Sequence, residues 1–287
     1  MKKFRLLCGY LIAAMILAAC EKPILPEDEG NVTFDFVLTQ QDITRATVTL
    51  GDYFEKMNMQ LFDADGNKVF EQVKTQTRED ANFGHFSCIL SEGTYTVVAV
   101  GHSSIRSATI KSPFMVQFTA SDGEKLTDTF CYCGQIEVGE NEQHQDFVMN
   151  RMTALVQFHF TDLEVPASFA YMVIEYTGGS ANFNPTTSLG CTKSTQSEQR
   201  QANDQQLYQV YTFPYMAVQG TLKMTRSAYD IDGNTIRRRT FDAVPVTRNR
   251  ITNYSGPFFE PGDGQFTQTG FGFLVNGKWD GIDEYTF

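Results

Sequence analysis

The sequence has little of what common active sites and nucleic-acid-binding surfaces require. Only four of its 287 residues are histidine and one is tryptophan, and 23 Lys and Arg stand against 34 Asp and Glu. The net charge of -11 argues against nucleic acid as a partner, because phosphate binding needs a concentrated basic surface. With 22 Gly and 9 Pro, the chain is neither collagen-like nor of low complexity. Its 41% hydrophobic and 20% charged residues are typical of a globular protein.

The chain also lacks the sequence motifs of well-known catalytic and cofactor sites. It has no nucleophile elbow, P-loop, dinucleotide-binding glycine pattern or His-Glu-x-x-His motif. The histidines are scattered without the paired spacing of metal ligands. They are His85, His102, His144 and His159. The sequence therefore predicts no catalytic residue, no metal and no cofactor, and we expect a protein that is not an enzyme.

The N-terminus has the pattern of a lipoprotein signal peptide. Basic residues precede an apolar run at 6–19, which is shorter than the roughly 20 apolar residues of a spanning helix. The run ends in Leu-Ala-Ala-Cys, which resembles the lipobox of bacterial lipoproteins. In that motif the thiol of the cysteine, here Cys20, takes the diacylglyceryl group. We therefore predict a signal peptide over residues 1–19, lipidation of Cys20 and attachment to the outer membrane.

The segment that follows Cys20 is predicted to be an extended tether. Residues 20–30 contain two prolines and four acidic residues, a composition typical of a linker. An acidic stretch directly after the lipid-bearing cysteine resembles the surface-export signal of some Gram-negative lipoproteins. This resemblance implies exposure on the outside of the cell, whereas the alternative interpretation is a solvated linker.

After residue 30, apolar residues alternate with the period of β-strands. The segment 155–160 (LVQFHF) alternates apolar and polar residues, and 95–100 (YTVVAV) is rich in β-branched and aromatic residues. Short runs of this kind, separated by turn residues, predict an antiparallel all-β protein. A β-sandwich of the ordinary kind has roughly 100 residues, so the length fits two. We expect them at residues 31–148 and 149–287.

A weak internal repeat supports two units. The chain reads FDADGNKV at 62–69 and YDIDGNTI at 229–236. Asp-Gly between strand-like runs predicts a hairpin turn, because glycine accepts the positive φ that the turn needs. The alternative, a calcium loop, lacks the closing glutamate and the flanking helices of an EF-hand.

Three other features leave alternatives open. The polar stretch at 178–206 is expected to be a flexible insertion, with a functional loop as the alternative. The basic cluster at 237–239 is expected to protect a sheet edge rather than to bind a ligand. Beyond the lipid site, the mature chain has four cysteines, which could be buried free thiols or could form disulfides. These are Cys88, Cys131, Cys133 and Cys191.

Several motifs of the mature chain, in this order, resemble a known family. They are MQLFDADGNKV at 59–69, GTYTVVAV at 93–100, MNRMTALVQF at 149–158, VPVTRNRITNY at 244–254 and VNGKW at 275–279. Together with the lipobox, they resemble the fimbrillin-A-associated anchor family, lipoprotein subunits of the type V pili of anaerobic gut and oral bacteria. The resemblance implies two tandem transthyretin-like β-sandwiches. It also implies fimbrial stalk subunits as partners and attachment to outer-membrane lipid through Cys20.

The same resemblance implies assembly by strand exchange. In the related stalk subunits, a protease acting after an arginine removes the first strand, and a neighbour's C-terminal strand fills the groove. The matching parts of this chain are a first strand at 33–38, the arginine Arg45 and a donor segment at 265–287. Candidate donor-strand residues, at alternate positions, are Phe271, Phe273 and Val275. The alternative interpretation of Arg45 is a loop residue that faces solvent.

The function that the resemblance implies is a structural subunit that anchors or caps a cell-surface fimbria. One alternative is a polymerising stalk or tip subunit matured by cleavage after Arg45, a cut that would also release the protein from its lipid. Another alternative is a surface glycan-binding lipoprotein, for which Trp279 and the tyrosines would have to form an exposed aromatic platform.

Overall fold

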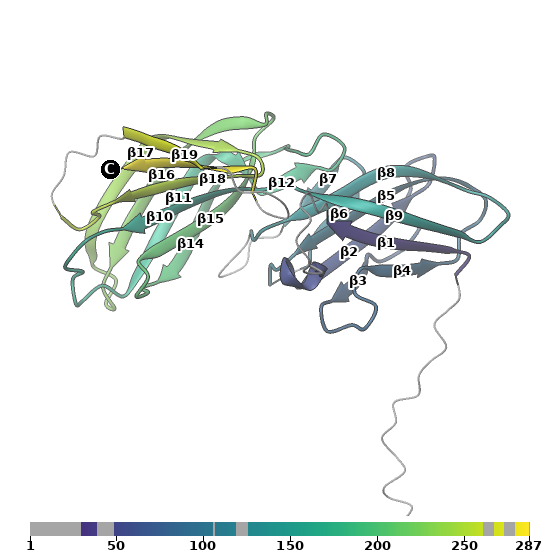
Figure 1. The fold of residues 1–287 in the computed structure, drawn as a ribbon, viewed down its shortest axis with the longest axis horizontal. Helices are drawn as coiled ribbons and strands as arrows, with labels where there is room; N and C mark the ends of the chain where they lie inside the picture. Colours follow the sequence, from purple (N-terminus) through teal and green to yellow (C-terminus); the bar gives the residue numbers. More distant parts are fainter. Residues whose placement is uncertain are drawn as a thin grey trace, which may run out of the picture.

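The computed structural model describes residues 30–38, 49–105, 107–118, 126–260, 267–272 and 279–286. Within these residues the chain is built of β-strands, apart from the short 3-10 helix η1 (Leu50–Asp52). The strands form two lobes that lie end to end along the long axis of the molecule (Figure 1). The expected all-β class with two tandem β-sandwich units is therefore confirmed.

The first unit is a curled sheet that holds the N-terminal strand between two strands distant in sequence. The order is β3 (Lys74–Thr77), β2 (Lys56–Phe62), β5 (Gly93–His102), β8 (Phe130–Val138), β9 (Gln143–Arg151), β1 (Val32–Leu38) and β4 (His85–Cys88). Neighbouring strands are antiparallel except β1 and β9, which are parallel. The predicted first strand at 33–38 is thus confirmed as part of β1.

The second unit contains the C-terminal strands. Its order is β17 (Thr235–Thr247), β16 (Gln219–Tyr229), β11 (Tyr171–Ser180), β15 (Leu207–Pro214), β10 (Ala154–Phe160), β18 (Arg250–Gly256), β20 (Gly281–Thr286) and β19 (Thr267–Gly272), with β14 (Lys193–Gln201) paired to β11. The β10–β18 and β18–β20 pairs are parallel. Because β17 ends the sheet, the arginines at 237–239 lie on an edge strand, as predicted.

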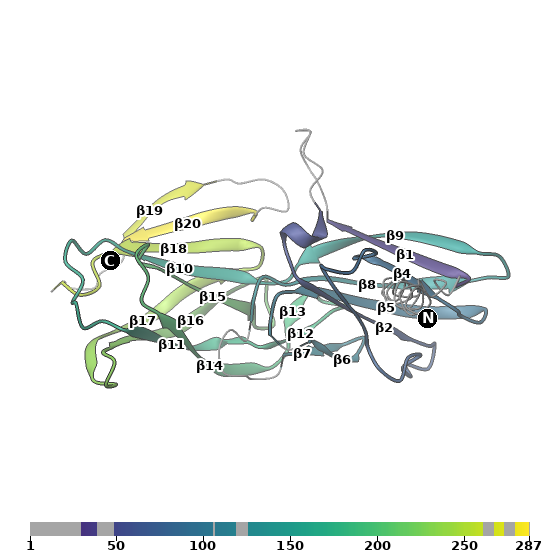
Figure 2. The same ribbon diagram turned by 90° about the horizontal axis from the view of Figure 1, so that it is seen from below.

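A small sheet joins the two units. It runs in the order β13 (Leu189–Gly190), β12 (Asn182–Asn184), β7 (Met115–Gln117) and β6 (Thr109–Ser112), and the β12–β7 pair crosses from one unit to the other. Val98 and Val116 of the first unit share a buried cluster with Phe183 and Phe213 of the second. Figure 2 shows these short strands between the two lobes. A shared apolar cluster resists relative motion of two units more than a polar linker would.

Each unit also has a core of its own. In the first, Met57, Met59 and Leu61 of β2 are fully buried. In the second, Phe158 of β10 stacks on Tyr254 of β18 at 4.9 Å between ring centroids. The position expected for the domain boundary, 148 and 149, lies inside β9, whose residues pair with strands of the first sheet.

The two copies of the Asp-x-Asp-Gly-Asn repeat form the predicted turns. Asp63 Oδ1 accepts hydrogen bonds from the backbone N–H groups of Asp65 and Asn67, and Gly66 has φ 81°. The second copy repeats this arrangement around Asp230, and its glycine has φ 84°. Hydrogen bonds lower the pKa of both carboxyl groups. The largest cause is the bond from the backbone N–H of Asn67 for Asp63 and the bond from the side-chain amide of Asn234 for Asp230.

The prediction of a flexible insertion at 178–206 is wrong. The segment contains β12, β13 and β14, and β14 pairs with β11 over nearly its whole length. Alternate residues of β14, Gln196 and Glu198, are buried. The polar composition misleads here because the sheet buries side chains that are not hydrophobic. Among the described residues, no helix has the length and apolar character needed to cross a membrane.

Candidate functional site

The N-terminal strand β1 pairs only with strands that are distant from it in the sequence. It pairs in parallel with β9 at seven positions, from Val32 with Gln143 to Leu38 with Met149. On its other side it pairs antiparallel with β4 at four positions. The chain therefore inserts its first strand between two strands that are themselves far downstream. Removal of β1 would leave unpaired backbone on both sides of the gap.

The inward face of β1 is aromatic. Val32, Phe34 and Phe36 are 0%, 0% and 4% exposed. Phe36 contacts the ring of Phe147 at 5.4 Å and the edge of Phe86 at 5.9 Å between centroids. Burial of each such side chain contributes about 1.5–3 kcal/mol. A vacated β1 position would thus expose an apolar groove, which is what an incoming strand needs.

The beginning of β1 is fixed by close contacts at residues 30 and 31. Gly30 N–H donates to Ser87 Oγ at 2.9 Å, and the Asn31 amide exchanges two hydrogen bonds with the backbone of Leu90. A Cβ at Gly30 would lie 2.3 Å from the carbonyl oxygen of Cys88, so only glycine fits there. The predicted tether at 20–30 therefore ends against the first sheet.

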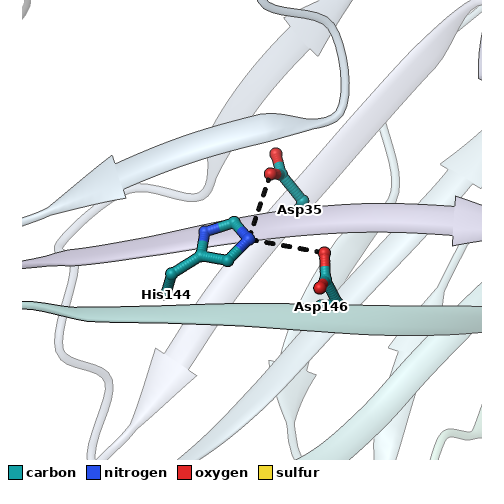
Figure 3. A group of neighbouring side chains, drawn as sticks. All are labelled: Asp35, His144 and Asp146. Atoms are coloured by element: carbon teal, nitrogen blue, oxygen red, sulfur yellow. Dashed lines mark ion pairs between the residues drawn. The ribbon is translucent and has the colours of Figure 1, made fainter.

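The outward face of β1 carries a polar cluster that includes two neighbouring strands. Asp35 lies opposite His85 of β4 and Asp146 of β9. His85 Nδ1–H donates to Asp35 Oδ1 at 2.6 Å. His144 Nε2 lies 3.5 Å from Asp35 Oδ2 and 3.5 Å from Asp146 Oδ1, and its Nδ1 lies 3.0 Å from Thr33 Oγ1. Figure 3 shows Asp35, His144 and Asp146 converging from the two strands.

This cluster was missed by the sequence analysis, which treated the histidines as scattered. His85 and His144 are 59 positions apart, and only the pairing of β1 with both β4 and β9 brings them to one face. The available signal was the alternation of Thr33 with Asp35 and of His144 with Asp146. Alternation places each pair on one face of its strand, but it does not tell which strands are neighbours.

The C-terminal strand β20 is integrated into the second unit. It lies between β18 and β19 and pairs in parallel with β18. Arg250 pairs with Asp283 at 2.7 Å, and the hydrogen bonds that the guanidinium donates to the Asp283 carboxylate raise the pKa of the arginine. Tyr285 stacks on Tyr254 at 4.7 Å between centroids. Figure 2 shows β19 as the outermost strand on this side of the second lobe, with β20 next to it.

Most of the predicted site residues lie outside the described part of the chain. These are Cys20, Arg45, Phe273 and Val275. The backbone of Phe271 is described: it lies in β19 and pairs with Asp283 of β20. The lipidation site, the processing site and the donor-strand role therefore stay predictions.

Trp279 is packed at the junction of the two units. The guanidinium carbon of Arg151 lies 4.2 Å from the centre of its ring, and Tyr211 stacks with it at 6.2 Å. Arg151 is 7% exposed and is also bound to Asp128. A tryptophan held in this way has less free ring face for sugar stacking than the glycan-binding interpretation requires.

The four cysteines of the mature units are free thiols. Cys88 and Cys131 are buried, and burial raises the pKa of both. A raised pKa keeps a thiol protonated and unreactive. Cys133 is half-buried, and its pKa is raised for the same reason. Cys88, Cys131 and Cys133 therefore pack as small hydrophobic groups rather than form a reactive site.

Comparison with known proteins identifies a family and several distant structural likenesses. The family profile of DUF6562, a family of unknown function, matches residues 112–267, more than half of the chain. No curated protein matches.

Among solved structures, the fimbrial anchor protein Mfa2 from Porphyromonas gingivalis is similar, with 14% identity and TM-score 0.41 over 72% of this chain and 80% of that one. A fimbrial assembly protein from Parabacteroides distasonis gives 12% identity and TM-score 0.41 over 79% and 90%. A DUF1812 protein from Bacteroides thetaiotaomicron, described as a candidate polysaccharide-binding protein, gives 10% identity and TM-score 0.47 over 72% and 78%.

Proposed function

This chain belongs to DUF6562, a family of unknown function, and we propose that it is a structural subunit that anchors or caps a cell-surface fimbria. In this proposal it is attached to the outer membrane by lipid on Cys20, is exposed on the cell surface and has no enzymatic activity. Its partners are fimbrial stalk subunits, which it binds by β-strand addition. Two of the similar structures carry fimbrial names, but at TM-scores of 0.41 the argument rests on this chain's own residues.

The observation that carries the proposal is the placement of β1. The predicted lipid site and β1 lie on the same side of Arg45 in the sequence. A cut after Arg45 would therefore remove the tether and β1 together and would open the groove beneath Phe34 and Phe36. An uncut chain keeps both the lipid and a filled groove. Such a chain cannot accept a strand at β1, and this fits a subunit at one end of a polymer.

The first test is the intact mass and N-terminus of the native protein from the cell envelope. The anchor proposal predicts a mass that corresponds to residues 20–287 plus acyl chains. A lipid-free chain that begins at Ala46 would refute the anchor role and would favour a processed stalk or tip subunit.

The second test concerns the C-terminal strand. Deletion of residues 265–287 should abolish complex formation with stalk subunits without preventing lipidation. A reversible disulfide between β18 and β20 tests the same strand without removing it. Asn253 and Glu284 are register partners of these strands, and Asn253 Nδ2 donates to Glu284 Oε2 at 2.6 Å, so the two positions are adjacent. The double variant Asn253→Cys, Glu284→Cys should form a disulfide that holds β20 in its own sheet.

If β20 is donated to the partner, the disulfide blocks complex formation and reduction restores it. Each single cysteine variant is the matched control and should bind as the unmodified chain does under both conditions. Equal binding by the oxidised and reduced double variant would refute donation of β20.

A further inference from the structure

The cluster on the outer face of β1 has the composition and spacing of a transition-metal site. Asp35, His144 and Asp146 each offer one ligand atom, and the three atoms lie within 4.8 Å of one another. A carboxylate–imidazole–carboxylate set suits zinc, whereas calcium and magnesium prefer oxygen ligands alone. Three protein ligands leave a fourth position of a tetrahedron open to water.

The two separations between the imidazole and the carboxylates agree with a tetrahedral ion. Zinc binds nitrogen and oxygen at about 2.0–2.2 Å, so neighbouring ligand atoms of a tetrahedron are about 3.3–3.6 Å apart. His144 Nε2 lies 3.5 Å from Asp35 Oδ2 and 3.5 Å from Asp146 Oδ1. Both separations exceed the usual N–H···O distance, which is at most about 3.2 Å. The imidazole is therefore placed better for a shared cation than for a hydrogen bond to either carboxylate.

Two of the three ligands, His144 and Asp35, also have a hydrogen-bonding partner behind them, as a metal site requires. The Nδ1–H of a metal-binding His144 donates to Thr33 Oγ1, which lies 3.0 Å away, and Nε2 is then free to bind the ion. Asp35 receives a hydrogen bond from His85 on Oδ1, so its Oδ2 is directed to the cluster. Ligand orientation by a partner behind each ligand is a regular feature of protein zinc sites.

The register of the strands supplies a separate electrostatic argument. Asp35 and Asp146 are direct partners in the β1–β9 pair, and like charges placed directly opposite each other destabilise a sheet. The described strands offer no lysine or arginine as an ion-pair partner of either carboxylate; their ion-pair partners are His85 and His144. A divalent cation between the two carboxylates would remove the repulsion.

We propose that Asp35, His144 and Asp146 bind a zinc ion that links β1 to β9. Asp35 is on β1 and the other two ligands are on β9, so release of β1 would require loss of the metal. Binding itself does not depend on any partner subunit. The consequence for strand exchange rests on the proposed function: zinc would keep the first strand in place, and its removal would favour an open groove.

The test is a calorimetric titration of zinc chloride into the purified full-length chain. We expect one zinc site that is lost or weakened more than about 100-fold in His144→Gln and in Asp146→Asn. His85→Gln, which affects only the orientation of Asp35, should weaken binding about 10–100-fold. His159→Gln is the matched control, because His159 is an exposed histidine of β10, and it should leave zinc binding unchanged.

A second readout measures the link between strands. Hydrogen exchange of the amides in Val32–Leu38 should slow when zinc is added to the unmodified chain and should not change in His144→Gln. Absence of zinc binding would overturn the proposal, and so would binding that is equal in all four variants, which would place the ion at other groups such as the cysteines. Neither experiment contains a stalk subunit, so their failure and the failure of the proposed function are separate results.

Discussion

The retention of β1 by its aromatic face can be tested with one substitution. Phe34 is 0% exposed, and its ring stacks with that of Phe147 at 5.7 Å between centroids. Truncation of a buried phenylalanine to alanine costs about 3–5 kcal/mol, because the lost burial adds to the cavity that is left. Phe34→Ala should therefore lower the free energy of opening of the first sheet around β1 by about this amount.

The natural control is on the same strand. Val37 is 44% exposed and points away from the core, so Val37→Ala should change the opening free energy by less than about 0.5 kcal/mol. The assay is native-state hydrogen exchange with mass spectrometry, read at the amides of β1, β4 and β9. A loss of 3 kcal/mol corresponds to exchange that is roughly 100-fold faster, since about 1.4 kcal/mol is a factor of ten.

Amides of the second unit, which has a separate core, should keep their exchange rates in Phe34→Ala. If Phe34→Ala exchanges no faster than Val37→Ala, burial of the β1 aromatic face does not hold the strand, and the groove would not drive strand addition. If both units lose protection equally, the chain opens as one cooperative body, and local release of β1 is refuted.

Three further predictions concern single positions. Burial lowers the pKa of His102 to about 3, so below pH 6.5 the unfolded chain binds a proton that the folded chain does not. The free energy of unfolding should therefore be highest above pH 6.5 and fall toward pH 3, by about 2 kcal/mol between pH 7 and pH 5. Urea titrations at each pH measure this loss, and His102→Gln should lack it. Gly30→Ala would place a Cβ 2.3 Å from the Cys88 carbonyl oxygen and should speed exchange at the start of β1, whereas unchanged exchange there would contradict the close approach. Arg226 is fully buried against Phe158, and its guanidinium nitrogens have no hydrogen-bond partner, so Arg226→Met should raise the thermal unfolding temperature; a fall would show that the charge is stabilised in the fold.

Local sequence signals predicted local structure well. The alternation at 155–160 predicted a strand, which is part of β10, and the paired Asp-Gly motifs predicted two turns that the hydrogen bonds of Asp63 and Asp230 confirm. Both signals are contained within a few residues, where alternation or a positive φ is decided by the neighbours along the chain.

Relations between distant segments could not be predicted in the same way. The insertion of β1 between β4 and β9 pairs it with residues that are at least 50 positions away in β4 and more than 100 positions away in β9. The polar segment of β14 is another example, because its strand character comes from pairing with β11 and not from its own composition. Side-chain packing and register decide which strands become neighbours, and local patterns in a single sequence do not predict either of them.

The candidate metal cluster depends on local alternation and also on long-range strand pairing, and the second of these could not be predicted from the sequence. Thr33 with Asp35 and His144 with Asp146 are each ordinary alternating pairs on a solvent-facing side of a strand. The parallel register, which sets Asp35 opposite Asp146, turns two exposed pairs into one site. A slip of one residue would send one pair to the other face of the sheet and separate the ligands. The arrangement that buries Phe34 and Phe36 is therefore the same one that assembles the polar face, so retention of the first strand and cation binding are expected to rise and fall together.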